Sequence, residues 1–366
     1  MSTITASVQA DSLIPISSPS FPVSLSPPAS RPNRFFTLLK RCALRLIFLW
    51  LGGTASGTVS AAEYDYDGPN PPRYVAPRAT DVRPQVALVL GSGGRRGFAH
   101  AGVLRVLDAE GLKPDLIVGV SIGSVIGALY AGGMTAADVE QLAMNLDLTD
   151  LRDLSWWYWG QVRGQKLQDF VNTHVHQRPL ESLGIRFAVV ATRQRDGAPQ
   201  IFNRGDTGLA VRTSSAVPGR FYAVRIEGVT YVDGDVVSPV PVRAARALGA
   251  NVVIAVDISA RVDNVPHTAP DEWLRIDRER RARIDAETKF ADVLIHPDIG
   301  YFAGTSGSYR ARVIAAAAEA TRAALPRIRS AMALKRPPPG PSTSPPAVTP
   351  PTAASPTPSP VPPAAR

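Results

Sequence analysis

Cysteine and histidine are scarce in this chain of 366 residues, and their scarcity limits the chemistry that it can perform. The single cysteine, Cys42, excludes an intramolecular disulfide, so cysteine content gives no indication of the redox compartment. Of the five histidines, His174 and His176 lie two residues apart in a polar stretch, a spacing that does not suit one helix face for a metal. The sequence therefore predicts no metal site, and no cofactor is expected.

The chain has a net charge of +9, but little of this charge lies in the part that is expected to fold. Residues 1–62 carry +4 and residues 335–366 carry +3, which leaves only +2 for residues 63–334. Nucleic acid is therefore not an expected partner. The basic flanks fit targeting or contact with an acidic membrane surface instead.

The N-terminal region holds a short apolar segment. Residues 1–32 are a Ser/Pro-rich leader, expected to be disordered, and residues 33–62 contain basic residues, an apolar run and then small residues. This order favours an export signal cleaved near Ala61 or Ala62, and hence a periplasmic or secreted protein. An uncleaved membrane anchor is the alternative, since 17 uncharged residues run from Leu46 to Ala62. A cytoplasmic location is the least favoured.

The rest of the chain is expected to form one α/β domain. Residues 63–84 are interpreted as a Pro-rich linker, and residues 333–366 as a disordered Pro-rich tail. Between them, residues 85–332 alternate apolar strand patterns with helical patterns. That alternation predicts a sheet with helices on both faces.

Two glycine-rich turns follow two of the predicted strands, at residues 91–97 and 119–123. The second places Ser121 between Gly119 and Gly123 on a sharp strand-to-helix corner, which is the pattern of an exposed nucleophile. A glycine–serine turn with a structural serine is the alternative interpretation.

The first turn offers backbone N–H groups at Gly93 and Gly94 that could hold an anion. Arg95 and Arg96 beside it could neutralise an oxyanion or a phosphate head group, or simply be solvated. A dinucleotide site is disfavoured, because Ser92 occupies the first glycine position of the G-x-G-x-x-G spacing. The next strand also ends without a ribose-binding acid. We therefore expect an acyl-transfer centre.

A serine nucleophile needs a base, and Asp233 is the favoured candidate. It lies at the end of a predicted strand and is followed by Gly234, so a carboxylate could reach the serine hydroxyl directly. A plain Asp-Gly turn is the alternative. A Ser…Asp…His triad that uses His296 also remains open.

Four motifs together resemble the patatin-like phospholipase family over about residues 86–300, and they lie at residues 93–104, 119–123, 214–219 and 231–241. The resemblance implies a three-layer α/β/α fold with a mostly parallel sheet. It implies a Ser–Asp dyad on Ser121 and Asp233, with Gly93, Gly94, Arg95 and Arg96 around the oxyanion hole. It also implies hydrolysis of lipid acyl esters, of the phospholipase A or lysophospholipase kind, without a metal.

Ser92, Arg95 and Asp235 depart from the usual family pattern. Asp235 could raise the pKa of Asp233 if the two carboxylates approach, or it could point into solvent. Three of the five tryptophans lie in residues 156–159, and we interpret this cluster as a patch facing a lipid surface.

Two alternative functions remain open from the sequence: an acyltransferase with the same dyad, and a non-catalytic lipid-binding module associated with a membrane. The sequence does not indicate an oligomeric state.

Overall fold

A computed structural model describes residues 62–82, 85–147, 151, 153, 161–261, 265–267, 269 and 271–335. All of these belong to one unit of the chain, Ala61–Arg366. The leader, the apolar segment up to residue 61, the tail from residue 336 and the tryptophan cluster at residues 156–159 lie outside the described residues.

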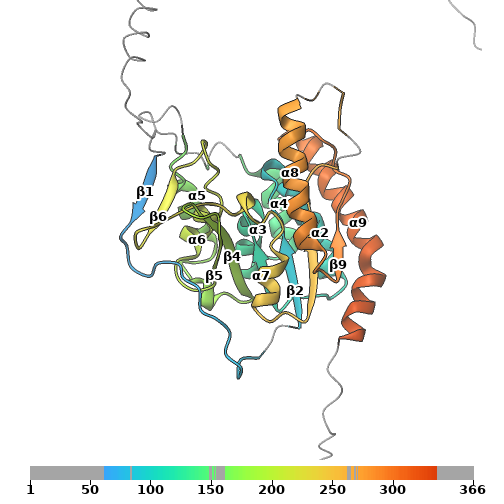
Figure 1. Cartoon of the computed structure of the whole chain (residues 1–366). Coiled ribbons are helices and arrows are strands. Elements are labelled where there is room, and N and C mark those ends of the chain that lie inside the picture. The colour runs from blue at the N-terminus through green and yellow to red at the C-terminus, as the bar shows by residue number, and fades with distance from the viewer. Residues whose placement is uncertain are drawn as a thin grey trace, which may run out of the picture. The chain divides into compact units, whose positions relative to one another are not determined.

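A nine-stranded sheet forms the centre of the described part of the chain (Figure 1). Neighbouring strands are parallel except for the β6/β7, β7/β4 and β5/β4 pairs, which are antiparallel. β5 (Pro199–Phe202) pairs with β4 alongside the main path. The main path runs through β1 (Glu63–Tyr66), β6 (Ala223–Ile226), β7 (Val229–Asp233), β4 (Arg186–Arg193), β3 (Leu116–Gly119), β2 (Val86–Leu90), β8 (Val252–Val256) and β9 (Val293–Ile295).

Helices cover both faces of this sheet. Successive side chains of a buried strand point to opposite faces, and both sets are apolar, so each face needs a helical layer to cover it. Leu88 and Leu90 of β2 face one helical layer, and Ala87 and Val89 face the other. The first layer comprises α2 (Ala99–Ala109), α3 (Ile122–Ala131), α4 (Ala136–Asn145), α5 (Gln165–His174), α6 (Thr207–Ser214) and α9 (Gly307–Leu334). The second comprises α7 (Val242–Ala247) and α8 (Asp271–Thr288). The predicted three-layer α/β/α fold with a mostly parallel sheet is thus confirmed.

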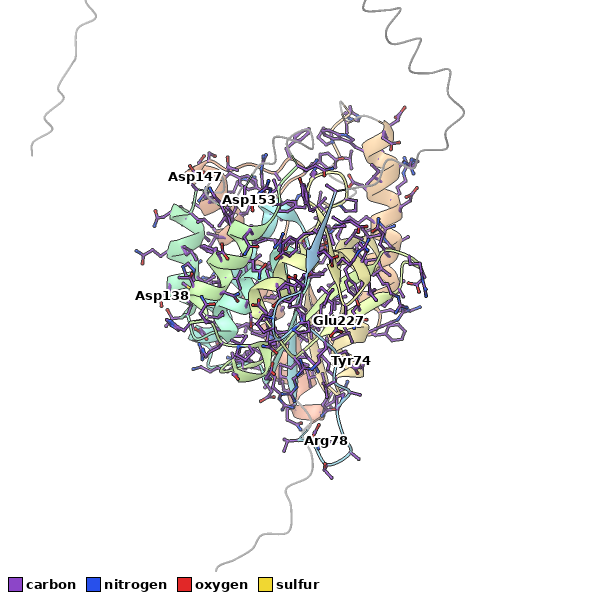
Figure 2. All side chains as sticks on the ribbon, turned by 90° about the vertical axis from the view of Figure 1, so that its left-hand side faces the viewer. Tyr74, Arg78, Asp138, Asp147, Asp153 and Glu227 are labelled. Atoms are coloured by element: carbon purple, nitrogen blue, oxygen red, sulfur yellow. The ribbon has the colours of Figure 1, made fainter. Side chains whose placement is uncertain are left out.

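Side-chain caps fix the starts of several helices. Thr135 and Asp138 form a reciprocal capping box at α4, and Asp153 accepts the N–H groups of Gly164 and Gln165 at the start of α5. Figure 2 labels Asp138 and Asp153. Such caps satisfy N–H groups that have no partner within the helix.

The segment predicted to be a linker begins with a strand. Glu63–Tyr66 pairs in parallel with β6 and forms one edge of the sheet, so the folded part of the chain starts before residue 85. Its sequence, EYDY, is half polar because an edge strand is only partly buried. Tyr74 and Arg78 further along the segment are exposed (Figure 2). Among the described helices, none is both long and apolar enough to cross a lipid bilayer.

Candidate active site

Strand register brings Ser121 and Asp233 to the same level of the sheet. Gly119, at the end of β3, pairs with Val189 of β4, whereas Asp233, at the end of β7, pairs with Ala191 of β4. Ser121 lies two residues beyond Gly119, so it reaches the level of Ala191 and Asp233. The two side chains meet there although they are 112 residues apart in the sequence.

Ser121 occupies a sharp corner between β3 and α3, with φ 51° and ψ −125°. Few non-glycine residues adopt this backbone conformation, and it persists only where the surroundings hold it. The Ser121 N–H donates to Ser214 Oγ at 2.9 Å, and Ser214 Oγ in turn donates to the Val190 carbonyl at 2.6 Å. Ser214 belongs to the third predicted motif, but its role in holding the corner was not foreseen.

The corner also depends on close backbone contact at Gly123, the second residue of α3. A Cβ atom on Gly123 would lie 2.1 Å from the Leu90 carbonyl oxygen, which belongs to the backbone of β2 and cannot swing away. We therefore expect Gly123→Ala to lower the free energy of unfolding by about 3 kcal/mol or more. Chemical denaturation monitored by circular dichroism measures this loss.

Gly307→Ala is the matched control, because Gly307 also lies at a helix N-terminus and a Cβ there would meet nothing within 4 Å. This control should be as stable as the unaltered chain or slightly more stable. Equal stability of the two variants would contradict the close approach at Gly123.

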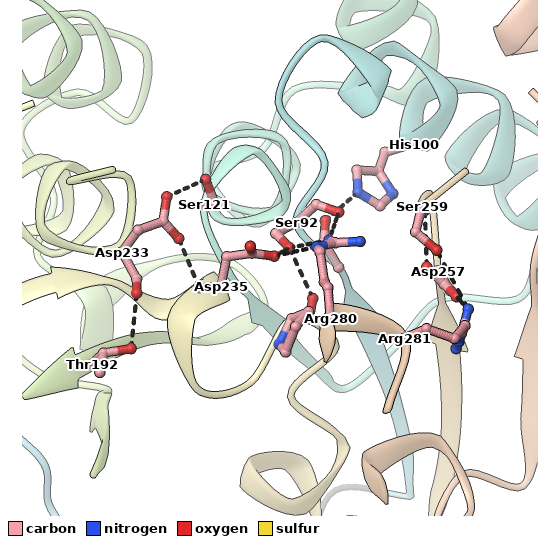
Figure 3. A network of polar contacts seen from close by, with 12 residues as sticks. Ser92, His100, Ser121, Thr192, Asp233, Asp235, Asp257, Ser259, Arg280 and Arg281 are labelled. Atoms are coloured by element: carbon pink, nitrogen blue, oxygen red, sulfur yellow. Dashed lines mark hydrogen bonds and ion pairs between the residues drawn. The ribbon is translucent and has the colours of Figure 1, made fainter. Parts of the chain in front are cut away.

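The Ser121 hydroxyl donates a hydrogen bond of 2.7 Å to Asp233 Oδ2 (Figure 3). The other carboxylate oxygen, Oδ1, accepts the N–H of Asp235 at 2.8 Å, and Thr192 Oγ1 donates to the Asp233 carbonyl at 2.8 Å. Asp233 is only 2% exposed. At Gly234, an added Cβ would lie 2.2 Å from the Val190 carbonyl oxygen, so glycine is required immediately after this carboxylate.

Burial raises the pKa of Asp233 to about 7, and the nearby charge of Asp235 adds to the increase. The hydrogen bonds from the Asp235 N–H and the Ser121 hydroxyl, together with the cationic Arg280, partly oppose it. A carboxylate with a pKa near 7 can both accept and return a proton at neutral pH.

The first glycine turn lies beside Ser121. Gly93 and Gly94 line cavities that also contain Ser121, as the sequence predicts for an oxyanion site. Arg96 Nη2 donates to the Tyr301 carbonyl, and burial lowers the pKa of its guanidinium. Arg95 is exposed and borders one cavity.

No histidine takes part in the contact between Ser121 and Asp233. His100 is buried, its Nε2 lies 2.8 Å from the Gly91 carbonyl oxygen, and burial lowers its pKa to about 4. His296 Nε2 lies 3.2 Å from the Ser259 carbonyl and 3.6 Å from the Asp257 carboxylate. The alternative triad with His296 is therefore wrong. In the described part of the chain, no cluster of histidine, cysteine and acidic residues could hold a metal ion.

Asp235 does not point freely into solvent, which was one of its two expected arrangements. Its Oδ1 atom accepts hydrogen bonds from Ser92 Oγ and from Arg280 Nε of α8, the latter at 2.9 Å (Figure 3). Sequence reasoning singled out Ser92 and Asp235 but missed Arg280, which is one of five arginines within the charged helix α8.

Two cavities meet at Ser121. One cavity, of about 430 Å³, is called here the charged-rim cavity because charged side chains border it between aliphatic ones, among them Arg96, Asp235, Asp277, Arg280 and Arg281. An apolar cavity of about 650 Å³ lies on the other side, between the elements of the first helical layer. It is lined mainly by aliphatic and aromatic side chains, which include Phe98, Val125, Ile126, Leu129, Leu142 and Phe170.

The sequence model of the patatin-like phospholipase family matches residues 88–246. The match contains both glycine turns, Ser121 and Asp233. The predicted resemblance to the patatin-like phospholipase family is thus confirmed.

Curated relatives of this patatin-like domain come from bacteria, animals and fungi. An "uncharacterized NTE family protein" of Mycobacterium tuberculosis is 35% identical over 190 residues, which are 50% of this chain and 53% of the relative. Human "patatin-like phospholipase domain-containing protein 6" is 32% identical over 184 residues, covering 48% of this chain and 13% of the relative.

"Lysophospholipase nte1" of Aspergillus fumigatus is 31% identical over 195 residues, covering 51% of this chain and 13% of the relative. The chain thus matches about half the length of the bacterial relative and a much smaller part of the other two.

Proposed function

We propose that this patatin-like domain hydrolyses acyl esters of lipids, with Ser121 as nucleophile and Asp233 as general base. The observation that carries the proposal is the 2.7 Å hydrogen bond from Ser121 Oγ to a buried carboxylate whose pKa is raised to about 7. The family match supports a lipid hydrolase, and one relative bears the name lysophospholipase.

The mechanism follows from this contact. Ser121 Oγ attacks the ester carbonyl carbon and passes its proton to Asp233. The carbonyl oxygen becomes an oxyanion, and the N–H groups of the Gly93–Gly94 turn, which lines the same cavity as Ser121, are the donors that we propose for it. The C–O bond then breaks, the leaving alcohol takes the proton from Asp233, and the acyl group remains on Ser121.

In the second half, water attacks the acyl-enzyme while Asp233 accepts its proton. The carboxylic acid leaves, and Ser121 regains its hydroxyl proton. An alcohol in place of water would give acyl transfer with the same residues, so the products distinguish hydrolysis from transfer. A non-catalytic lipid-binding module is disfavoured, because it would not require a strained serine bound to a buried carboxylate.

The two cavities suggest how a lipid ester would lie. The apolar cavity suits an acyl chain, because its lining is aliphatic and aromatic. The charged-rim cavity suits an anionic leaving group, since several arginines border it. Their junction at Ser121 would bring the scissile carbonyl to the nucleophile. Two further points stay predictions: that the lipid comes from a membrane surface, and that the protein is exported from the cytoplasm.

Hydrolysis of a lysophospholipid or a p-nitrophenyl acyl ester by the full chain tests the proposal. Because Asp233 must be ionised to accept a proton, kcat/KM should rise about tenfold per pH unit below pH 7 and level off above it. This fall of kcat/KM on the acidic side is called the acid limb. An acid limb that began only near pH 4 would contradict Asp233 as the base. Failure of every acyl ester to react would contradict the function itself.

A further inference from the structure

Ser92, Asp235 and Arg280 form a cluster, called here the clamp, which joins the two halves of the site. Ser92 directly precedes the Gly93–Gly94 turn, Asp235 follows Asp233 by two residues, and Arg280 lies on α8. Ser92 is 2% exposed, whereas the side chains of Arg280 and Asp235 are 14% and 34% exposed. The clamp is therefore buried at Ser92 and partly open at Asp235, at the wall of the charged-rim cavity.

Arg280 binds both of the other residues (Figure 3). Its Nε atom donates to Asp235 Oδ1 at 2.9 Å, and its Nη2 atom donates to Ser92 Oγ at 2.7 Å and to the Ser92 carbonyl at 3.1 Å. Ser92 Oγ donates in turn to Asp235 Oδ1. A planar guanidinium can hold several acceptors at a fixed geometry in a way that an ammonium group cannot.

Asp235 connects the clamp to the proposed catalytic pair. Its backbone N–H donates to Asp233 Oδ1 at 2.8 Å, while its side chain holds Ser92 and Arg280. The Ser92 N–H is fixed as well, because it donates to the Pro239 carbonyl at 2.9 Å. One chain of contacts thus runs from the base, through Asp235 and Ser92, to the turn that faces Ser121.

We propose that the clamp is a positioning device, in which Arg280 of α8 fixes the Gly93–Gly94 turn relative to Ser121 and Asp233. This inference rests on the proposed function. The clamp residues act through the turn and the base, since none of them is hydrogen-bonded to Ser121. A displacement of about 1 Å in such a site lowers the rate by about 10²-fold.

The clamp also sets the charge around the base. The charged groups that act on Asp233 are Asp235 on its own loop and Arg280 on α8, whereas the β3–α3 corner and β4 present the hydroxyls of Ser121 and Thr192. Arg280 offsets the charge of Asp235. Removal of Arg280 should raise the pKa of Asp233 further, and removal of the Asp235 charge should lower it.

Four variants of the full chain test the clamp through kcat, KM and the pH profile of ester hydrolysis. Arg280→Ala should lower kcat about 10- to 100-fold, leave KM within about threefold and move the acid limb to higher pH. Arg280→Lys keeps the charge, so it should leave the limb in place with an intermediate kcat. Asp235→Asn keeps an acceptor oxygen but loses the charge, so the limb should move to lower pH. Arg278→Ala, an exposed arginine on the same helix, is the control.

Opposite shifts of the acid limb in Arg280→Ala and Asp235→Asn would support the clamp, because general loosening of the fold cannot produce them. The clamp is overturned if Arg280→Ala keeps kcat within twofold of the Arg278→Ala control, or if both limbs move the same way. Should the unaltered chain hydrolyse no ester, the proposed function fails and the clamp fails with it. An active chain with unaffected variants overturns the clamp alone.

Discussion

Replacing Ser121 with alanine should lower kcat/KM for ester hydrolysis by at least about 10⁴-fold, because the acyl-enzyme forms on the Ser121 hydroxyl, which donates to Asp233. The fold should survive, since alanine keeps both the Cβ atom and the backbone N–H that donates to Ser214 Oγ. The experiment compares ester turnover with labelling by a fluorophosphonate reagent, which reacts covalently with an activated serine hydroxyl.

Ser330→Ala is the control for this variant, because Ser330 is exposed on α9. The unaltered chain and the control should be labelled at the peptide that contains Ser121, and Ser121→Ala should not be labelled. Turnover by Ser121→Ala within tenfold of the control would show that the nucleophile lies elsewhere.

Replacing Asp233 with asparagine should have two effects of opposite sign. Hydrolysis should fall by about 10³-fold, since the amide cannot accept the Ser121 proton. The folded state should gain stability at pH 8, because burial raises the pKa of Asp233 to about 7 from the unfolded value of 3.8. The folded state therefore holds its proton more tightly, and stability falls as pH rises from about 4 through 7.

Asparagine removes this loss, so the gain at pH 8 is at most about 4 kcal/mol. It should vanish near pH 4, where the carboxyl is protonated in both variants. Denaturation at the two pH values measures it, with the exposed Asp67→Asn as control. The measured quantity is the free energy of unfolding of Asp233→Asn minus that of the unaltered chain. If this difference were smaller at pH 8 than at pH 4, the raised pKa would be contradicted.

The sequence predicted the alternation of strands and helices and the central pair because those features are encoded locally. The strand before each glycine turn is continuous and apolar, and the helix from Ile122 begins where glycine permits a close backbone approach. Asp233 stood out because glycine follows it at the end of a strand. The edge strand Glu63–Tyr66 was missed because half of its residues are polar.

The clamp could not be predicted for a different reason. Arg280 and Ser92 are 188 residues apart, and nothing in the local pattern distinguishes Arg280 from its neighbours on α8. Only the packing of α8 against the sheet selects which arginine faces inward. The same holds for Ser214, whose hydroxyl bridges the Ser121 N–H and the Val190 carbonyl across three elements.

The attachment of α8 has a consequence for motion. Only Ile284 and Glu287 of this 18-residue helix are buried, and Glu287 is held by Ser238 and by the Arg243 N–H. Ion pairs such as Arg281 with Asp257 supply much of the remaining attachment. Elements with few apolar contacts open at a lower free energy than the core, so the amides of α8 should exchange hydrogen faster than those of β2 and β3. Each such opening would withdraw Arg280, and added salt would make openings more frequent.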